Sequence, residues 1–152
     1  MVSPFALSLG EGNPTSADWA NGADACVTDA ITLLASGSAQ NAYMLGGLAV
    51  ELALKGRIMH TNRWNRWPSR KTRPDVHSHI LGNLMSAAGL KPALEQEVLL
   101  CSDIGLAWMV VKDFDISTRY PLGKPFPKRT AVDFVDAIDS LGLVQWLTTG
   151  IR

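Results

Sequence analysis

Apolar residues recur along most of this chain at steps of three and four positions, the spacing of one face of an α-helix. The first such stripe contains Trp19, Ala23 and Cys26, with Ser16 placed to cap its start and Gly37 placed to end it. No segment alternates apolar and polar residues for long enough to predict a strand. The pattern predicts helices at about residues 17–36, 41–58, 80–88, 93–112 and 130–147. With short connections, these elements predict an all-α, antiparallel up-and-down bundle of about five helices.

The second helix, 41–58, is apolar nearly all round and yet carries Glu51 and Lys55. These two charges lie one turn apart in the order that suits the helix dipole, so they are either an ordinary surface pair or a polar patch in a groove between helices, with His79 or Arg119 nearby. The adjacent Gly46 and Gly47 weaken the helix and therefore predict close approach of another helix. We expect 41–58 to be the central helix of the bundle.

The last helix has a start signal of its own. Thr130 is followed three residues later by Asp133, the spacing of a capping box, so we expect the helix to begin there.

Length and composition set the class of the protein. A chain of 152 residues, of which 47% are apolar, can bury one sizeable core, so we expect a single domain over residues 1–152, with an irregular N-terminal arm at 1–15. Formal net charge is zero, which argues against a uniformly basic nucleic-acid binder. Charge is concentrated, however: between Arg57 and His79 the chain carries six Arg or Lys residues and one acid, so one loop or face is basic.

The chain has two cysteines, Cys26 and Cys101, which form no metal-type spacing and no disulfide framework. Its start lacks a cationic segment followed by a long apolar stretch, and charges interrupt the central helix within the length that a bilayer requires. We therefore expect a cytoplasmic protein with no membrane contact.

Residues 59–77 form a basic loop rich in Trp and Arg, in which the triplet Asn-Arg-Trp occurs twice in succession. Pro68 and Pro74 disfavour a continuous helix there. Arginines that alternate with indoles are able to hold a phosphate backbone and stack on unpaired bases. Alternatively, Trp64 and Trp67 cover the core, or they dock a protein partner.

Four stretches form a combined pattern in a fixed order: residues 42–55 (AYMLGGLAVELALK), residues 79–84 (HILGNL), Trp108 and residues 119–121 (RYP). Together they resemble the HEPN (higher eukaryotes and prokaryotes nucleotide-binding) superfamily over roughly residues 17–121. The resemblance implies a helical bundle, commonly a homodimer, that acts on RNA or nucleotides in toxin–antitoxin, defence or RNA-processing systems. An antitoxin or a nucleotidyltransferase is the partner that it suggests.

Many HEPN proteins are metal-independent ribonucleases with an Arg-x(4–6)-His motif. Such a histidine moves the proton of a 2′-hydroxyl, while the arginine holds charge on the phosphorus. In this chain Arg73 to His79 and Arg70 to His77 have that spacing, although they precede the third helix and no histidine follows Arg119. The resemblance therefore gives Arg73, His77 and His79 as candidate catalytic residues.

Other candidates would bind the ligand rather than react with it. The candidate binding residues are Glu51, Lys55, Arg63, Trp64, Arg66, Trp67, Arg70, Arg119 and Tyr120.

Two of the candidate residues also have a purely structural interpretation. For Arg119 we prefer an ion pair with Glu51 over contact with a phosphate. For His79, a bond to backbone is the alternative to catalysis.

The sequence thus predicts a HEPN-like domain that binds RNA or a nucleotide, with or without cleavage. A metal-independent endoribonuclease toxin and a helical protein-interaction module are the alternatives. We expect no cofactor, and no metal site, because the histidines lack Cys or carboxylate partners at ligand spacing.

Overall fold

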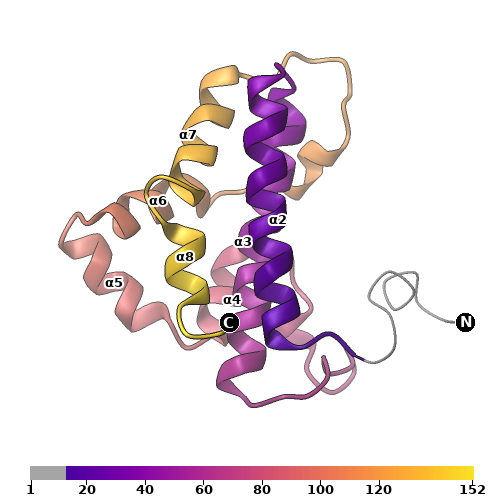
Figure 1. Cartoon of the computed structure of the whole chain (residues 1–152), viewed down its shortest axis with the longest axis vertical. Helices are drawn as coiled ribbons and strands as arrows, with labels where there is room; N and C mark the ends of the chain where they lie inside the picture. The colour runs from indigo at the N-terminus through magenta and orange to yellow at the C-terminus, as the bar shows by residue number, and fades with distance from the viewer. Residues whose placement is uncertain (1–12) are drawn as a thin grey trace, which may run out of the picture.

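The computed structural model describes residues 13–152, and its regular elements are all helical. Figure 1 shows two long helices lying side by side, with the shorter helices packed against one side of them. The α-helices are α2 (Ser16–Ala35), α3 (Ala39–Thr61), α4 (Leu81–Ala87), α5 (Lys91–Leu99), α6 (Asp103–Val111), α7 (Lys128–Ile138) and α8 (Leu143–Thr148). Two short 3-10 helices, η1 (Pro74–Val76) and η2 (Ile116–Arg119), lie between them. The all-α bundle is confirmed.

Helices α2 and α3 form the antiparallel hairpin that the short connection predicts (Figure 1). Thr15, rather than the expected Ser16, caps α2: its hydroxyl accepts from the backbone N–H of Asp18, and the Asp18 carboxylate accepts in turn from the backbone N–H of Thr15. Gly37 adopts a φ of +87° in the turn, a conformation that suits glycine.

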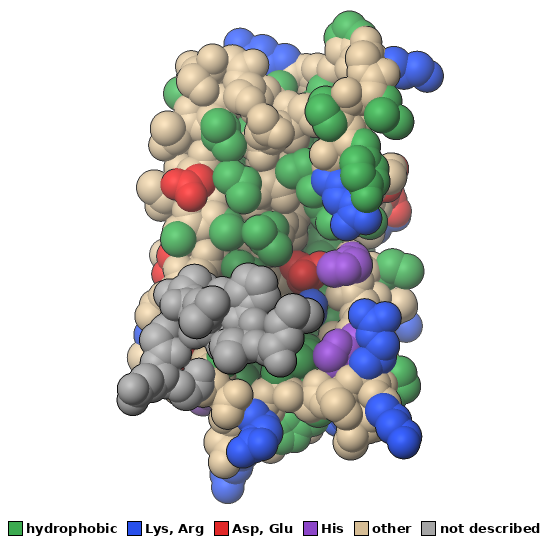
Figure 2. Space-filling view, turned by 90° about the vertical axis from the view of Figure 1, so that its right-hand side faces the viewer, with side chains coloured by type: hydrophobic (Ala, Val, Ile, Leu, Met, Phe, Trp, Pro, Cys, Tyr) green, Lys and Arg blue, Asp and Glu red, His purple; other side chains and the backbone are tan. Residues whose placement is uncertain are grey.

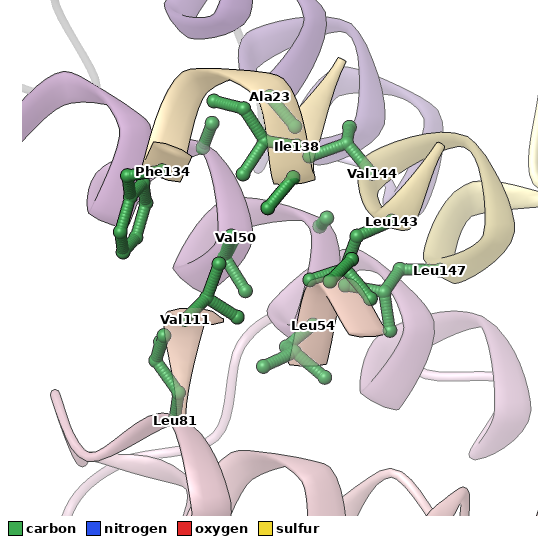
Figure 3. Close-up of a cluster of buried hydrophobic side chains, with 14 of the residues drawn as sticks. Ala23, Val50, Leu54, Leu81, Val111, Phe134, Ile138, Leu143, Val144 and Leu147 are labelled. Atoms are coloured by element: carbon green, nitrogen blue, oxygen red, sulfur yellow. The ribbon is translucent and has the colours of Figure 1, made fainter. Parts of the chain in front are cut away.

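Helix α3 is the central helix, as predicted, because α2, α4, α7 and α8 all pack on it. Figure 3 shows its Val50 and Leu54 among side chains from the surrounding helices, including Leu81, Phe134 and Leu147. All five side chains are buried, and burial of each contributes about 1.5–3 kcal/mol.

The glycine pair of α3 permits the close approach that its position predicts. A Cβ on Gly46 would lie 2.8 Å from the ring of Phe134, which belongs to α7. At Gly47 the close neighbour is Phe114, which lies not on a helix but in the segment after α6. A Cβ on Gly47 would lie 2.1 Å from this ring.

The prediction of a single helix over 93–112 is wrong, because two helices, α5 and α6, cover this range. Cys101 has a φ of +51°, and the hydroxyl of Ser102 caps α6 by accepting from the backbone N–H of Gly105. A Cβ on Gly105 would lie 2.3 Å from the carbonyl oxygen of Glu97, so the two helices meet closely at this glycine.

The last predicted helix is also divided, since Gly142 with a φ of +82° separates α7 from α8. The capping box expected at Thr130 is wrong. Helix α7 begins earlier, after Pro127, and Asp133 forms a salt bridge with Arg129 at 2.9 Å instead. Among residues 13–152, no helix is both long and apolar enough to cross a membrane. Of the arm expected at 1–15, residues 1–12 lie outside the described residues.

Candidate functional site

A buried carboxylate lies at the centre of the candidate site. Glu51 on α3 is only 7% exposed, and each of its carboxylate oxygens has a partner. Oε1 lies 2.7 Å from Nδ1 of His79, and Oε2 lies 3.2 Å from Nζ of Lys55. Because an ionised carboxylate only accepts hydrogen bonds, we assign the imidazole proton to Nδ1. Glu51, Lys55 and His79, here called the carboxylate triad, therefore form one connected polar group.

His79 is fixed in this position by the segment that leads into α4. Val76 before it and Leu81 after it are both buried, so they anchor the backbone on either side of the histidine. The hydroxyl of Ser78 accepts from the backbone N–H of Ile80. The side chain of His79 is nevertheless 56% exposed. With Nδ1 bound to Glu51, the opposite nitrogen Nε2 is the one that can serve an external ligand.

On the face shown in Figure 2, one of two neighbouring histidines lies beside an acidic side chain. Hydrophobic side chains border this acidic side chain, and Lys and Arg side chains lie close to the histidines. The face therefore combines an imidazole, a carboxylate, apolar surface and positive charge.

An apolar pocket adjoins the carboxylate triad. It has a volume of about 220 Å³, and Glu51 and His79 are its polar lining residues. The apolar lining comes from α3 and from the segment around η2: Met44, Leu45, Leu48, Phe114 and Ile116. A larger pocket of about 710 Å³ lies between α4, α5 and α6, where it contains none of the site residues that the sequence predicts.

Two expectations about the site are wrong. Arg119 does not pair with Glu51: its guanidinium lies 4.8 Å from the ring centroid of Tyr120, and both residues are exposed. His79 does not bond to backbone, because its Nδ1 contacts Glu51. Both errors have one cause, namely that the start of α4 comes close enough to α3 to give Glu51 a different partner.

The tryptophans of the basic loop pack against the protein. Trp64 and Trp67 are half-buried against the core, and their rings lie 6.0 Å apart. The ring centroid of Trp67 also lies 5.3 Å from that of Trp19 on α2 and 6.0 Å from that of His77. Nε2 of His77 in turn lies 2.7 Å from the carbonyl oxygen of Pro68. This packing corresponds to the alternative in which the indoles cover the core.

Arg73 is engaged within the loop itself. Its guanidinium lies 5.0 Å from the ring centroid of Trp64, and it holds the Asp75 carboxylate through two hydrogen bonds of 2.8 and 2.7 Å. These two hydrogen bonds lower the pKa of Asp75 and raise that of Arg73. Of the three candidate catalytic residues, the structure thus brings only His79 to the buried carboxylate.

Four cations of the loop are exposed: Arg63, Arg66, Arg70 and Lys71. None of them forms a salt bridge with an acidic side chain within residues 13–152. Lys55 links the other triad residues to the loop, because its Nζ contacts Glu51 and also lies 5.8 Å from the ring centroid of Trp67. The basic loop and the triad are therefore parts of one region.

Sequence reasoning missed Phe114 and Ile116. They stand outside every predicted helix, yet both line the pocket. Phe114 is held against Tyr43, with 5.1 Å between ring centroids, and the hydroxyl of Tyr43 accepts from the backbone N–H of Asp115. Burial raises the pKa of Tyr43 above its ordinary value, so the phenol stays neutral. An aromatic residue soon after a helix was the only signal of this contact.

In the described part of the chain, no three His, Cys, Asp or Glu side chains gather as metal ligands would. Comparisons of the chain with models of protein families, with curated proteins and with solved structures found no match.

Proposed function

We propose that this chain is a HEPN-like domain that binds RNA through the exposed cations of its basic loop and through the carboxylate triad. The observation that carries the proposal is the His79–Glu51 contact of 2.7 Å, which orients an exposed imidazole beside a region of free positive charge. Exposed guanidinium groups bind phosphate oxygens with paired donors, and an imidazole is a donor or acceptor near neutral pH. A bacterial toxin–antitoxin or defence system is the context that the resemblance proposes.

Salt dependence tests the binding directly. Each phosphate contact in a single strand contributes about −0.7 to the slope of log affinity against log salt, so four loop cations give a slope of about −3. We expect fluorescence anisotropy with a single-stranded RNA oligomer to show this slope. The double substitution Arg63→Glu, Arg66→Glu should weaken binding and make the slope shallower. Binding that is insensitive to both salt and charge reversal would refute the proposal.

RNA cleavage is a second candidate function, and the same contact favours it. A neutral imidazole with Nδ1 held by a carboxylate presents Nε2 as a general base, which would take the proton of a 2′-hydroxyl as that oxygen attacks the adjacent phosphorus. The 5′-oxygen of the next nucleotide then leaves and takes up a proton, which gives a 2′,3′-cyclic phosphate and a 5′-hydroxyl.

The cleavage assay uses purified protein and single-stranded RNA in EDTA, with product ends identified by mass spectrometry. Cyclic phosphate ends that His79→Ala abolishes and His77→Ala retains would establish the enzyme. Intact RNA together with salt-sensitive binding would support the binding function and refute cleavage.

A further inference from the structure

The apolar pocket beside His79 has a chemistry that the phosphate-binding groups do not share. We propose that it is a binding site for one unstacked nucleobase of the bound RNA. The inference rests on the proposed function and adds to it a specific place for a base. It starts from the lining of the pocket, which consists of five apolar side chains together with Glu51 and His79.

The size of the pocket suits one flat ring system. Its volume of about 220 Å³ is below the roughly 300–1,000 Å³ of sites that enclose a whole drug-sized ligand. A nucleobase is a group of the required size, and it belongs to the same polymer as the phosphates outside. Apolar and aromatic side chains hold bases by their faces, which every base possesses.

The walls of the pocket are held in place by other contacts. The sulfur of Met44 accepts a hydrogen bond of 2.8 Å from the hydroxyl of Thr118, and Phe114 packs against both Tyr43 and Phe134, with ring centroids 5.1 and 5.8 Å away. A thioether and an aromatic ring are favourable neighbours for another π-system. Gly47 supplies the space that Phe114 occupies. The pocket is thus formed before any ligand arrives.

Hydrogen bonding decides which part of a nucleotide enters. The five apolar lining side chains offer no donor to a phosphate, and Nδ1 of His79 is already bonded to Glu51, whereas the face of a base needs no donor. The phosphate is expected outside, at the exposed side of His79 and near the loop cations. Both carboxylate oxygens of Glu51 already have partners, so the base is held by its faces and little discrimination between bases is expected.

Filling the pocket tests this assignment. Leu48 lines it and is 38% exposed, so Leu48→Trp places a bulky indole in the space without adding a charge. Ile31 on α2 is 40% exposed and does not line the pocket, which makes Ile31→Trp the matched control. Both proteins are titrated against an oligoadenylate and against the abasic ribose-phosphate backbone of the same length. Circular dichroism verifies that each variant is folded.

We expect Leu48→Trp to weaken binding of the oligoadenylate about fivefold or more, the contribution of one stacked base, and to leave binding of the abasic backbone unchanged. Ile31→Trp should change neither. An independent readout without substitution is the methyl NMR spectrum, in which Leu45, Leu48 and Ile116 should shift with the oligoadenylate and not with the abasic backbone.

The two ways of failing are distinct. If wild-type protein binds RNA with the expected salt dependence but Leu48→Trp has no effect and the methyl signals do not move, the nucleobase site is wrong and the proposed function stands. If neither oligomer binds, the proposed function fails and the nucleobase site fails with it.

Discussion

Replacing Gly47 by alanine would place a methyl group against the ring that forms one wall of the pocket. The new Cβ would lie 2.1 Å from Cε2 and Cζ of Phe114. Ordinary contact begins at 3.4 Å, so the ring would have to move by about 1.3 Å. Phe114 would then lose contact with Tyr43 and Phe134, whose ring centroids now lie 5.1 and 5.8 Å away.

Two opposing effects set the change in the free energy of unfolding that Gly47→Ala causes. Overpacking of a formed core costs about 1–3 kcal/mol, while alanine stabilises a helix by about 1 kcal/mol relative to glycine. Because the overlap is severe, we take the upper part of the first range and expect a net loss of about 2 kcal/mol in the free energy of unfolding. For a chain of this length, that loss lowers Tm by about 4–8 °C.

Gly22→Ala is the matched control, since Gly22 also lies within a helix but its Cβ would meet only Leu52, at 3.4 Å. Differential scanning calorimetry should show a higher Tm for Gly22→Ala and a lower Tm for Gly47→Ala. Equal gains in both variants would refute the reasoning, because they would mean that helix propensity decides the outcome and that Phe114 does not pack on Gly47.

Three further substitutions or reactions test other parts of the structure. Glu51→Gln keeps the shape of the side chain but leaves the buried Lys55 ammonium without its anion, so urea denaturation should show a loss of about 1–3 kcal/mol in the free energy of unfolding. Asp133→Asn, in an exposed pair of the same helical spacing, should lose less than about 0.5 kcal/mol. Arg57→Ala removes two bonds to carbonyl oxygens at the end of α8, so amide exchange should accelerate there and not at the start of α2. Burial raises the pKa of the Cys26 thiol and reduces its thiolate fraction at a given pH, whereas Cys101 is exposed, so alkylation at pH 8 should label Cys101 first and Cys101→Ser should remove the fast phase.

The sequence predicts the helical elements well where apolar spacing and length agree. Helices α2 and α3 lie close to their expected ranges because their patterns run for about five or more turns without interruption. The two breaks were missed for different reasons. Gly142 is a visible signal at which the apolar spacing happens to continue, whereas the turn at Cys101 has a positive φ at a residue that is not glycine, and no glycine or proline within 99–103 marks it.

The pair of Glu51 and Lys55 was predicted from their spacing on one helix, and the structure has this contact at 3.2 Å. For the residue beside this pair, the sequence offered His79 or Arg119 and did not decide between them. The contact of Glu51 with His79 depends on how the segment before α4 packs against α3, which is a long-range relation with no local signature. Arg119 was paired with Glu51 because opposite charges in one family pattern invite that inference, yet the guanidinium stacks on its own neighbour, Tyr120.

The central claim is that Glu51 orients an exposed His79 toward RNA phosphate. Long-range ¹H–¹⁵N NMR of the histidine rings, recorded with and without a single-stranded RNA oligomer, tests it most directly. We expect His79 to carry its proton on Nδ1 in the free protein, Glu51→Gln to remove this preference, and RNA to move the Nε2 signal. An unchanged His79 ring at an RNA concentration that saturates the protein would contradict the claim.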